Sequence, residues 1–237
     1  MREAGRITSR ALDAVAAAVR PGVTTAELDA VAEETILAAG ALPAFKGYHG
    51  FPATLCTSVN EQVVHGIPGK RALREGEIVS VDCGAIVDGY YGDSARTFPV
   101  GAVSSEVVRL MDVTRASLEA GIARCMPGMR LYDVSAAVQS VAEAAGFSVV
   151  REYVGHGIGR AMHEDPQIPN YGKAGTGPTL KAGMVLAIEP MINAGAADVR
   201  SLDDGWTVVT ADGAVSAHFE HTVAITDEGP LILTVSE

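Results

Sequence analysis

The chain has 237 residues, of which 48% are hydrophobic and 20% charged, a composition that is typical of a globular domain and excludes a mainly disordered chain. The formal net charge of −11 argues against a nucleic-acid backbone as the main partner, so we expect no direct nucleic-acid binding. No apolar run reaches the roughly 18 residues of a membrane helix. Three cysteines without metal-type spacing suit a reducing compartment, so we expect a cytoplasmic protein without a membrane partner.

The first predicted elements are two helices joined by a short turn. Thr25, followed by Glu27 and Leu28, is typical of a helix start, and a glycine suits the left-handed position after a helix end. Three landmarks define this unit: Leu12, Pro21-Gly22 and Gly40. The same landmarks recur at a constant offset of 106 residues: Leu118, Pro127-Gly128 and Gly146. We therefore predict a duplicated chain that folds as a single domain over 1–237, with halves at about 1–106 and 107–237.

A strand with an acidic residue follows each predicted helix pair. The runs 76–82 and 183–189 are short, apolar and rich in β-forming residues, and they end in Asp82 and Glu189. Two such halves would pack about a pseudo-twofold axis. The sequence therefore predicts an α+β fold with a central antiparallel sheet inside and helices outside.

A two-residue turn predicts the register of a hairpin in the first half. Asp88-Gly89 between two β-prone runs is a strong hairpin signal, and it would pair Gly84 with Asp93. Residues two apart on one strand share a face. Asp82 and Asp93 should therefore be diagonal neighbours, roughly 7–8 Å apart, and could reach adjacent metal ions.

The second half offers Glu189 and Glu220, which would mirror this pair. Four buried acids would be prohibitive without compensating charge, which two divalent cations would supply. Oxygen-rich ligation completed by one neutral imidazole suits Mn, Fe, Co or Zn in a two-metal hydrolytic site. Taken alone, however, an aspartate at a strand end is usually a turn residue, and a single histidine is usually structural. We assign no function to three of the histidines: His49, His218 and His221.

A series of spaced motifs covers the chain from about Arg2 to Leu233. The longest motif is Tyr153-Val154-Gly155-His156-Gly157-Ile158-Gly159, which is followed by His163 and Ile168-Pro169-Asn170-Tyr171. The other motifs are Tyr48-His49-Gly50-Phe51-Pro52, Asn60-Glu61, Val64-His65-Gly66-Ile67-Pro68, Ile188-Glu189-Pro190-Met191, Asp204-Gly205-Trp206-Thr207 and Glu220-His221-Thr222. Together they resemble the signature of the type I methionine aminopeptidases.

The resemblance implies the pita-bread fold and removal of the initiator methionine from nascent chains whose second residue is small. It implies two divalent metal ions (Co, Mn, Fe or Zn) and leaves the cellular metal open. It implies five metal ligands: Asp82, Asp93, His156, Glu189 and Glu220. Asp93 and Glu220 would bridge the ions, His156 and Glu189 would complete one ion, and Asp82 would chelate the other. Gly155 and Gly157 would let the backbone around His156 come close to an ion.

The resemblance also implies roles in catalysis and substrate binding. Glu189 would shuttle a proton, while His65 and His163 would hold the substrate amide and the oxyanion. The methionine pocket would be formed by Tyr48, Phe51, Cys56, His65, Met162, His163 and Trp206. The sequence departs from common family members at Phe45, Phe51 and Met162, which stand where cysteine, tyrosine and phenylalanine are frequent. A monovalent cation, Na or K, is expected at backbone carbonyls near Asn60, Gln62 and Ser216.

Three alternative interpretations stay open at this point. A prolidase-type peptidase would share the fold, although such enzymes usually carry a further N-terminal domain. A non-catalytic relative would have lost metal ligands, whereas all five are present here. A cytosolic module could instead bind a peptide in the central cleft without cleaving it. As partners we expect nascent polypeptide N-termini and the ribosome, with no visible ribosome-docking element, and we expect a monomer.

Overall fold

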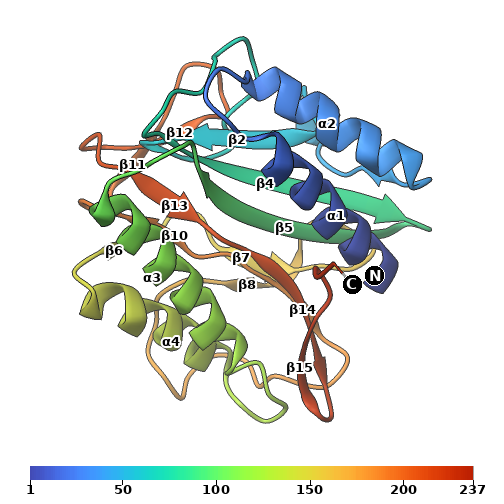
Figure 1. Cartoon of the computed structure of the whole chain (residues 1–237). Coiled ribbons are helices and arrows are strands. Elements are labelled where there is room, and N and C mark those ends of the chain that lie inside the picture. Colours follow the sequence, from blue (N-terminus) through green and yellow to red (C-terminus); the bar gives the residue numbers. More distant parts are fainter. Residues whose placement is uncertain (237) are drawn as a thin grey trace.

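The computed structural model describes residues 1–236, in which two pairs of helices cover the strands (Figure 1). The first pair is α1 (Arg2–Ala18) and α2 (Thr25–Ala38). The second pair is α3 (Ser105–Ile122) and α4 (Leu131–Ala144). Each pair packs over its own group of strands, so the two halves of the chain have similar architectures.

Local chemistry explains where these helices begin and how each pair is joined. The predicted start of α2 at Thr25 is confirmed, because Thr24 caps the helix. Its hydroxyl accepts a hydrogen bond from the Glu27 backbone N–H (3.2 Å), and the Glu27 carboxylate accepts one from the Thr24 N–H (2.7 Å). Gly22 and Gly128 occupy the equivalent turns with φ of 89° and 88°, which glycine adopts without strain.

The first half contains a four-stranded antiparallel sheet in which β4 pairs with every other strand. Its strands are β1 (Leu42–Pro43), β2 (Leu55–Val59), β4 (Ile78–Val87) and β5 (Tyr90–Pro99). The Asp88-Gly89 turn joins β4 to β5 and places Gly84 opposite Asp93, which confirms the predicted hairpin register. Asp82 lies inside β4, which continues to Val87, and it shares a face of the sheet with Asp93.

The second half contains a five-stranded sheet with the order β15-β14-β9-β7-β8. Its strands are β7 (Gly155–Gly157), β8 (Glu164–Ile168), β9 (Val185–Ile188), β14 (His221–Thr226) and β15 (Gly229–Ile232). Ile188 pairs with His221, so Glu189 and Glu220 are the next residues at that end of the two strands. The acids of this half therefore lie at strand ends, whereas Asp82 and Asp93 lie within longer strands.

Two three-stranded sheets and a short 3₁₀ helix complete the fold. One sheet has the order β13-β10-β6 and the other β11-β12-β3, so the single central sheet that the sequence predicts is divided into several. The first comprises β6 (Ser148–Val149), β10 (Met191–Asn193) and β13 (Ser216–His218). The second comprises β3 (Gln62–Val64), β11 (Val199–Ser201) and β12 (Val208–Thr210). The 3₁₀ helix η1 is Tyr48–Gly50.

Side chains of β5 connect the two halves at the middle of the molecule. The Ser94 hydroxyl donates to the Glu220 carbonyl oxygen (2.6 Å), and the Thr97 hydroxyl donates to the His218 carbonyl oxygen (2.8 Å). β5 therefore lies beside the segment that joins β13 to β14, as Figure 1 shows. This junction brings the acidic residues of the two halves together.

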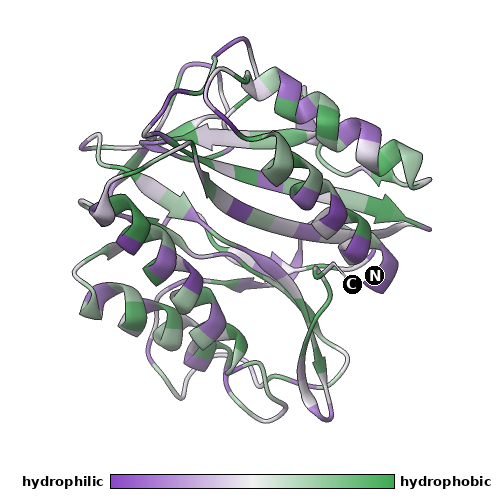
Figure 2. Ribbon diagram, in the orientation of Figure 1, coloured by the Kyte–Doolittle hydropathy of each residue, from purple (hydrophilic) through white to green (hydrophobic). Residues whose placement is uncertain are grey.

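Each half has its own hydrophobic core. The landmark residues Leu12 and Leu118 are buried in different clusters, one under α1 and α2 and the other under α3 and α4. Burial of such a leucine contributes about 1.5–3 kcal/mol to stability. Figure 2 shows the corresponding alternation of hydrophobic and hydrophilic residues along the helices. Among the described residues, no helix combines the length and apolarity needed to cross a membrane.

Candidate metal centre

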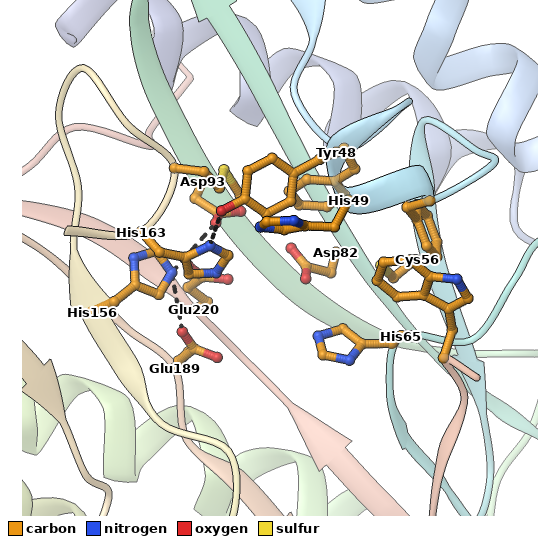
Figure 3. A pocket seen from close by; sticks show the side chains of 14 residues that line it. Tyr48, His49, Cys56, His65, Asp82, Asp93, His156, His163, Glu189 and Glu220 are labelled. Atoms are coloured by element: carbon orange, nitrogen blue, oxygen red, sulfur yellow. Dashed lines mark hydrogen bonds and ion pairs between the residues drawn. The ribbon is translucent and has the colours of Figure 1, made fainter. Parts of the chain in front are cut away.

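The structure brings all five predicted metal ligands to one cavity of about 220 Å³ (Figure 3). Asp82 and Asp93 come from β4 and β5, and His156 comes from β7. Glu189 follows β9, and Glu220 precedes β14. The ligand set is therefore built by strands of both halves. The remaining lining residues are Phe45, Tyr48, His49, Phe51, Cys56, His65, Met162, His163 and Trp206.

Three of the five residues form a compact group that could hold one ion. One ligand atom from each of Asp93, His156 and Glu220 lies within 4.8 Å of the other two. His156 Nε2 is also 3.5 Å from Glu189 Oε1 and 3.8 Å from Asp93 Oδ2. Asp82 lines the same cavity on the side of β4. The assignment of a particular role to each ligand stays a prediction.

The four acids of the cavity could ionise together only if positive charge were added nearby. Burial raises the pKa of Asp82 to about 7. Burial, followed by the charge of Asp82, also raises the pKa values of Asp93 and Glu189 well above their usual range. Burial and then the neighbouring Asp93 do the same to the pKa of Glu220. These acids resist ionisation together because each negative charge is desolvated and repelled by the next.

Three of the carboxylates also have an oxygen atom that lacks a hydrogen-bond partner in the described part of the chain and could coordinate a metal. Asp82 Oδ1, Asp93 Oδ1 and Glu220 Oε1 are buried without a hydrogen-bond partner among residues 1–236. Buried polar atoms of this kind are costly unless something coordinates them. Burial lowers the pKa of His156 to about 4, so its imidazole is neutral and able to bind a metal at neutral pH. Carboxylate oxygens and one imidazole suit borderline divalent cations, so the residues present fit a divalent metal.

Contacts that the sequence analysis did not identify position the ligand backbones. Thr222 Oγ1 accepts a hydrogen bond from the Asp93 N–H (3.0 Å) and donates one to the Asp93 carbonyl oxygen (2.7 Å). The Asn170 side chain donates to the Glu189 carbonyl oxygen (3.0 Å). Both residues belong to the sequence motifs, and this membership could have marked them as functional. The motifs do not indicate their hydrogen-bond partners, which are far away in the chain.

The glycines around His156 allow close packing of neighbouring strands, a reason that the sequence analysis did not give. A Cβ at Gly155 would overlap the carbonyl oxygen of Ala187, and a Cβ at Gly157 would overlap that of Asp165. These glycines therefore allow β7 to fit between β9 and β8, and the expectation that they also make room for an ion stays a prediction. The close strand packing in turn fixes where His156 points.

Three further histidines line the cavity beside the predicted metal ligands (Figure 3). His163 lies with its ring 4.3 Å from the His156 ring, and its Nδ1 is 2.7 Å from the Tyr48 hydroxyl. Burial lowers the pKa of His65 to about 4. Its ring meets the Tyr153 ring edge to face, with the ring centroids 5.5 Å apart. His49, to which the sequence analysis assigned no function, also lines the cavity.

Apolar side chains form much of the cavity wall. Phe51 and Trp206 meet edge to face with their ring centroids 5.0 Å apart. The Asp204 carboxylate accepts hydrogen bonds from the backbone N–H groups of Trp206 (2.9 Å) and Thr207 (2.8 Å), and this turn presents the indole to the cavity. The predicted pocket residues other than the two histidines belong to one hydrophobic cluster: Tyr48, Phe51, Cys56, Met162 and Trp206. Phe45, noted in the sequence only as a departure, belongs to the same cluster.

The residues expected near a monovalent cation lie away from this cavity. The Asn60 carbonyl oxygen accepts a hydrogen bond from the Ser216 N–H (2.9 Å), so these two residues meet across the halves. Gln62 Oε1 accepts a hydrogen bond from the Val59 N–H (2.8 Å). The three residues thus lie around one turn, and the monovalent site itself stays a prediction.

Comparison with known proteins defines the class. The model of metallopeptidase family M24 matches residues 1–227, and the chain belongs to this family. It is therefore a member of a family of metal-dependent hydrolases, and its buried acidic group supports the use of a divalent metal.

Similar proteins include methionine aminopeptidases. A Clostridium acetobutylicum protein named methionine aminopeptidase is 55% identical over 238 residues, which cover 100% of this chain and 95% of that protein. The crystal structure of methionine aminopeptidase from Thermotoga maritima has a TM-score of 0.98 at 49% identity and covers 100% of this chain and 95% of that chain. These matches confirm both the expected fold class and the resemblance found in the sequence.

A prolidase shares the architecture at a greater distance. The prolidase from Pyrococcus horikoshii has a TM-score of 0.80 at 22% identity and covers 100% of this chain and 61% of that chain. A likeness at this level of identity shows the fold alone.

Proposed function

We propose that this protein is a methionine aminopeptidase that removes the initiator methionine from polypeptides whose second residue is small. The observation that carries the proposal is a largely buried cluster of four carboxylates and one imidazole that lines the same cavity as a group of apolar side chains. The pocket suits an unbranched thioether side chain, and the cluster suits the metal chemistry of amide hydrolysis. The names of the close relatives support the same activity.

Two divalent cations would be held by the five residues at the centre of the cavity. Asp93 and Glu220 would bridge them, His156 and Glu189 would complete one site, and Asp82 would complete the other. Co, Mn, Fe and Zn all suit these donors. Such cations supply a Lewis acid and an activated water, which is the chemistry that peptide-bond hydrolysis needs. A monovalent cation, Na or K, near Asn60, Gln62 and Ser216 would support the fold nearby.

The neutral histidines and Glu189 would handle the substrate and the proton. His163 would donate a hydrogen bond to the carbonyl oxygen as negative charge develops there. His65, across the cavity, would hold the substrate amide, and Glu189 would carry a proton to the departing amine. The apolar side chains would bind the methionine, with the Phe51–Trp206 pair forming one wall.

The remaining proposals concern the setting of the reaction. We propose that the substrates are nascent polypeptide N-termini presented at the ribosome, and that the chain acts in the cytoplasm as a monomeric single domain. The net charge of −11 supports action without direct nucleic-acid binding.

The test is a release assay on three peptides that begin Met-Ala, Met-Pro and Met-Arg. The protein is first freed of metal by chelation, and each divalent ion is then restored separately. We expect methionine release from the first two peptides only, and only with metal. Efficient release from the Met-Arg peptide would contradict the small-residue rule. Release from the Met-Pro peptide alone would favour a prolidase-type activity. A binding protein would bind metal without releasing methionine.

A further inference from the structure

One hydrogen bond in the cavity joins a tyrosine of the first half to a histidine of the second. The Tyr48 hydroxyl lies 2.7 Å from His163 Nδ1, although the two residues are 115 positions apart in the chain. Figure 3 shows the phenol pointing at the His163 ring, beside the ring of His156. Tyr48 is therefore more than a wall of the apolar pocket, because its polar end contacts the histidine nearest to the metal ligands.

The backbone around Tyr48 fixes the position of this hydroxyl. The Tyr48 N–H donates to the Phe45 carbonyl oxygen (2.9 Å), and the Phe51 N–H donates to the Tyr48 carbonyl oxygen (2.9 Å). His49 adopts a φ of 47°, a left-handed conformation that a histidine holds only where the surroundings impose it. These hydrogen bonds hold the turn in the conformation that presents the phenol to His163.

The inventory of donors and acceptors leaves two directions for this hydrogen bond. A neutral imidazole has one N–H donor and one acceptor nitrogen. A phenol hydroxyl can either donate to an unprotonated Nδ1 or accept from a protonated one. The phenol has no other hydrogen-bond partner among residues 1–236. If the hydroxyl donates to Nδ1, the imidazole proton resides on Nε2.

We propose that Tyr48 is a positioning residue that selects the tautomer of His163 in which Nε2 carries the proton. This inference rests on the proposed function, in which His163 donates a hydrogen bond to the substrate oxygen. In the other tautomer, the Nδ1–H group would donate its hydrogen bond to the Tyr48 hydroxyl, and Nε2 could only accept a hydrogen bond. A phenol that donates to Nδ1 therefore leaves Nε2 as the hydrogen-bond donor of the His163 ring.

The tautomer can be read without measuring activity. Long-range ¹H–¹⁵N spectra of the zinc-loaded full-length protein would resolve its six histidines, and His163→Gln would assign the resonance. We expect a protonated Nε2 and an unprotonated Nδ1 in the wild type, and a shift toward the other tautomer in Tyr48→Phe. A wild-type His163 with a protonated Nδ1 would overturn the proposal. This result would stand whether or not the protein releases methionine, so it separates this inference from the proposed function.

A double-mutant cycle tests the consequence for turnover. Tyr48→Phe keeps the ring in the pocket and should lower kcat roughly two- to tenfold, the range expected for one lost hydrogen bond, with little change in KM. In a His163→Ala background the same change should have no effect, because Tyr48 acts through that ring. Equal losses in both backgrounds would mean that Tyr48 acts independently and would overturn the proposal. Tyr90→Phe is the matched control, since it removes a hydroxyl that accepts a hydrogen bond from Arg160 outside the cavity (2.8 Å).

Discussion

Asp93 illustrates how a residue can depend on both halves of the molecule. Its position opposite Gly84 follows from the local hairpin, but its backbone is held by Thr222 from the other half. Its carboxylate then faces His156 and Glu220. A single aspartate thus connects local register, packing between the halves and the chemistry of the site.

The bridging assignment predicts a loss of metal. Asp93→Ala or Glu220→Ala should remove at least one bound ion, because each carboxylate would serve both ions. Activity should fall by more than about 10²-fold, since even outer partners of a metal ligand are typically worth 10- to 100-fold. Metal analysis after gel filtration and a release assay would measure both effects. Asp112→Ala, which removes an exposed ion pair on α3, is the control and should behave as wild type. Two retained ions with near-native turnover in either variant would contradict the bridging assignment.

The two adjacent histidines should respond differently to substitution. His156→Ala should weaken metal binding itself, because its neutral imidazole lies among the carboxylates. His163→Ala should keep its metal and lose about 10²–10³ in turnover, the usual cost of one donor to an oxyanion. Titrating metal into both variants and measuring turnover at saturation distinguishes them. Rescue of His163→Ala by excess metal would identify His163 as a ligand instead.

At the scale of elements, the site depends on the close packing of three short strands. β7 carries His156 between β8 and β9, and glycines on either side of the histidine allow the neighbouring carbonyl groups to approach. The helices contribute by burying the outer faces of the sheets rather than by supplying ligands. Stability and metal binding are therefore linked through β7.

This packing predicts the effect of a single methyl group. Gly157→Ala should force β7 and β8 apart and lower the free energy of unfolding by about 1–3 kcal/mol, while weakening metal binding through His156. Gly69→Ala is the control, because a Cβ there would meet nothing within 4 Å, and it should change stability by less than about 0.5 kcal/mol. Urea denaturation and metal titration of both variants would test this. Similar stability and metal affinity in the two variants would show that β7 is not tightly constrained.

For the whole molecule, the buried acids connect folding to metal and to pH. Burial raises the pKa of Asp82 from 3.8 to about 7, so its contribution to the stability of the metal-free fold is present at low pH and is lost as pH rises through about 7. His65 and His156 affect the pH dependence of stability in the opposite direction, because burial lowers their pKa values from 6.5 to about 4. Their contribution is present above pH 6.5 and is lost as pH falls toward 4.

These two opposite pH dependences of stability predict how much a bound metal stabilises the fold at each pH. Above about pH 6.5 the histidines no longer titrate, so the metal-free protein should become less stable as pH rises. Metal must displace the protons of the acids, so its binding should strengthen over the same range. The rise in Tm caused by metal should therefore grow from about pH 6 to about pH 8. Thermal unfolding with and without zinc would test this, and a rise independent of pH would contradict it.

Much of this arrangement is encoded locally and could be predicted. The Asp88-Gly89 turn sets the register that puts Asp82 and Asp93 on one face, because a two-residue hairpin leaves a single pairing of the strands. Thr24 and Glu27 start α2, and the repeated Pro-Gly turns mark the same helix pair twice. Such features depend on contacts between residues a few positions apart, so they can be inferred without knowledge of the packing.

The meeting of the halves is different, because it depends on how two separate sheets pack. No local pattern indicates that Thr222 holds Asp93, that His49 lines the cavity, or that the glycines beside His156 accommodate neighbouring strands. The same holds for the contact between Tyr48 and His163, which spans 115 residues. Sequence motifs identified most of the residues of the site. Which atoms touch was decided by tertiary packing, because side chains distant in the chain have no geometry in common until both cores have formed.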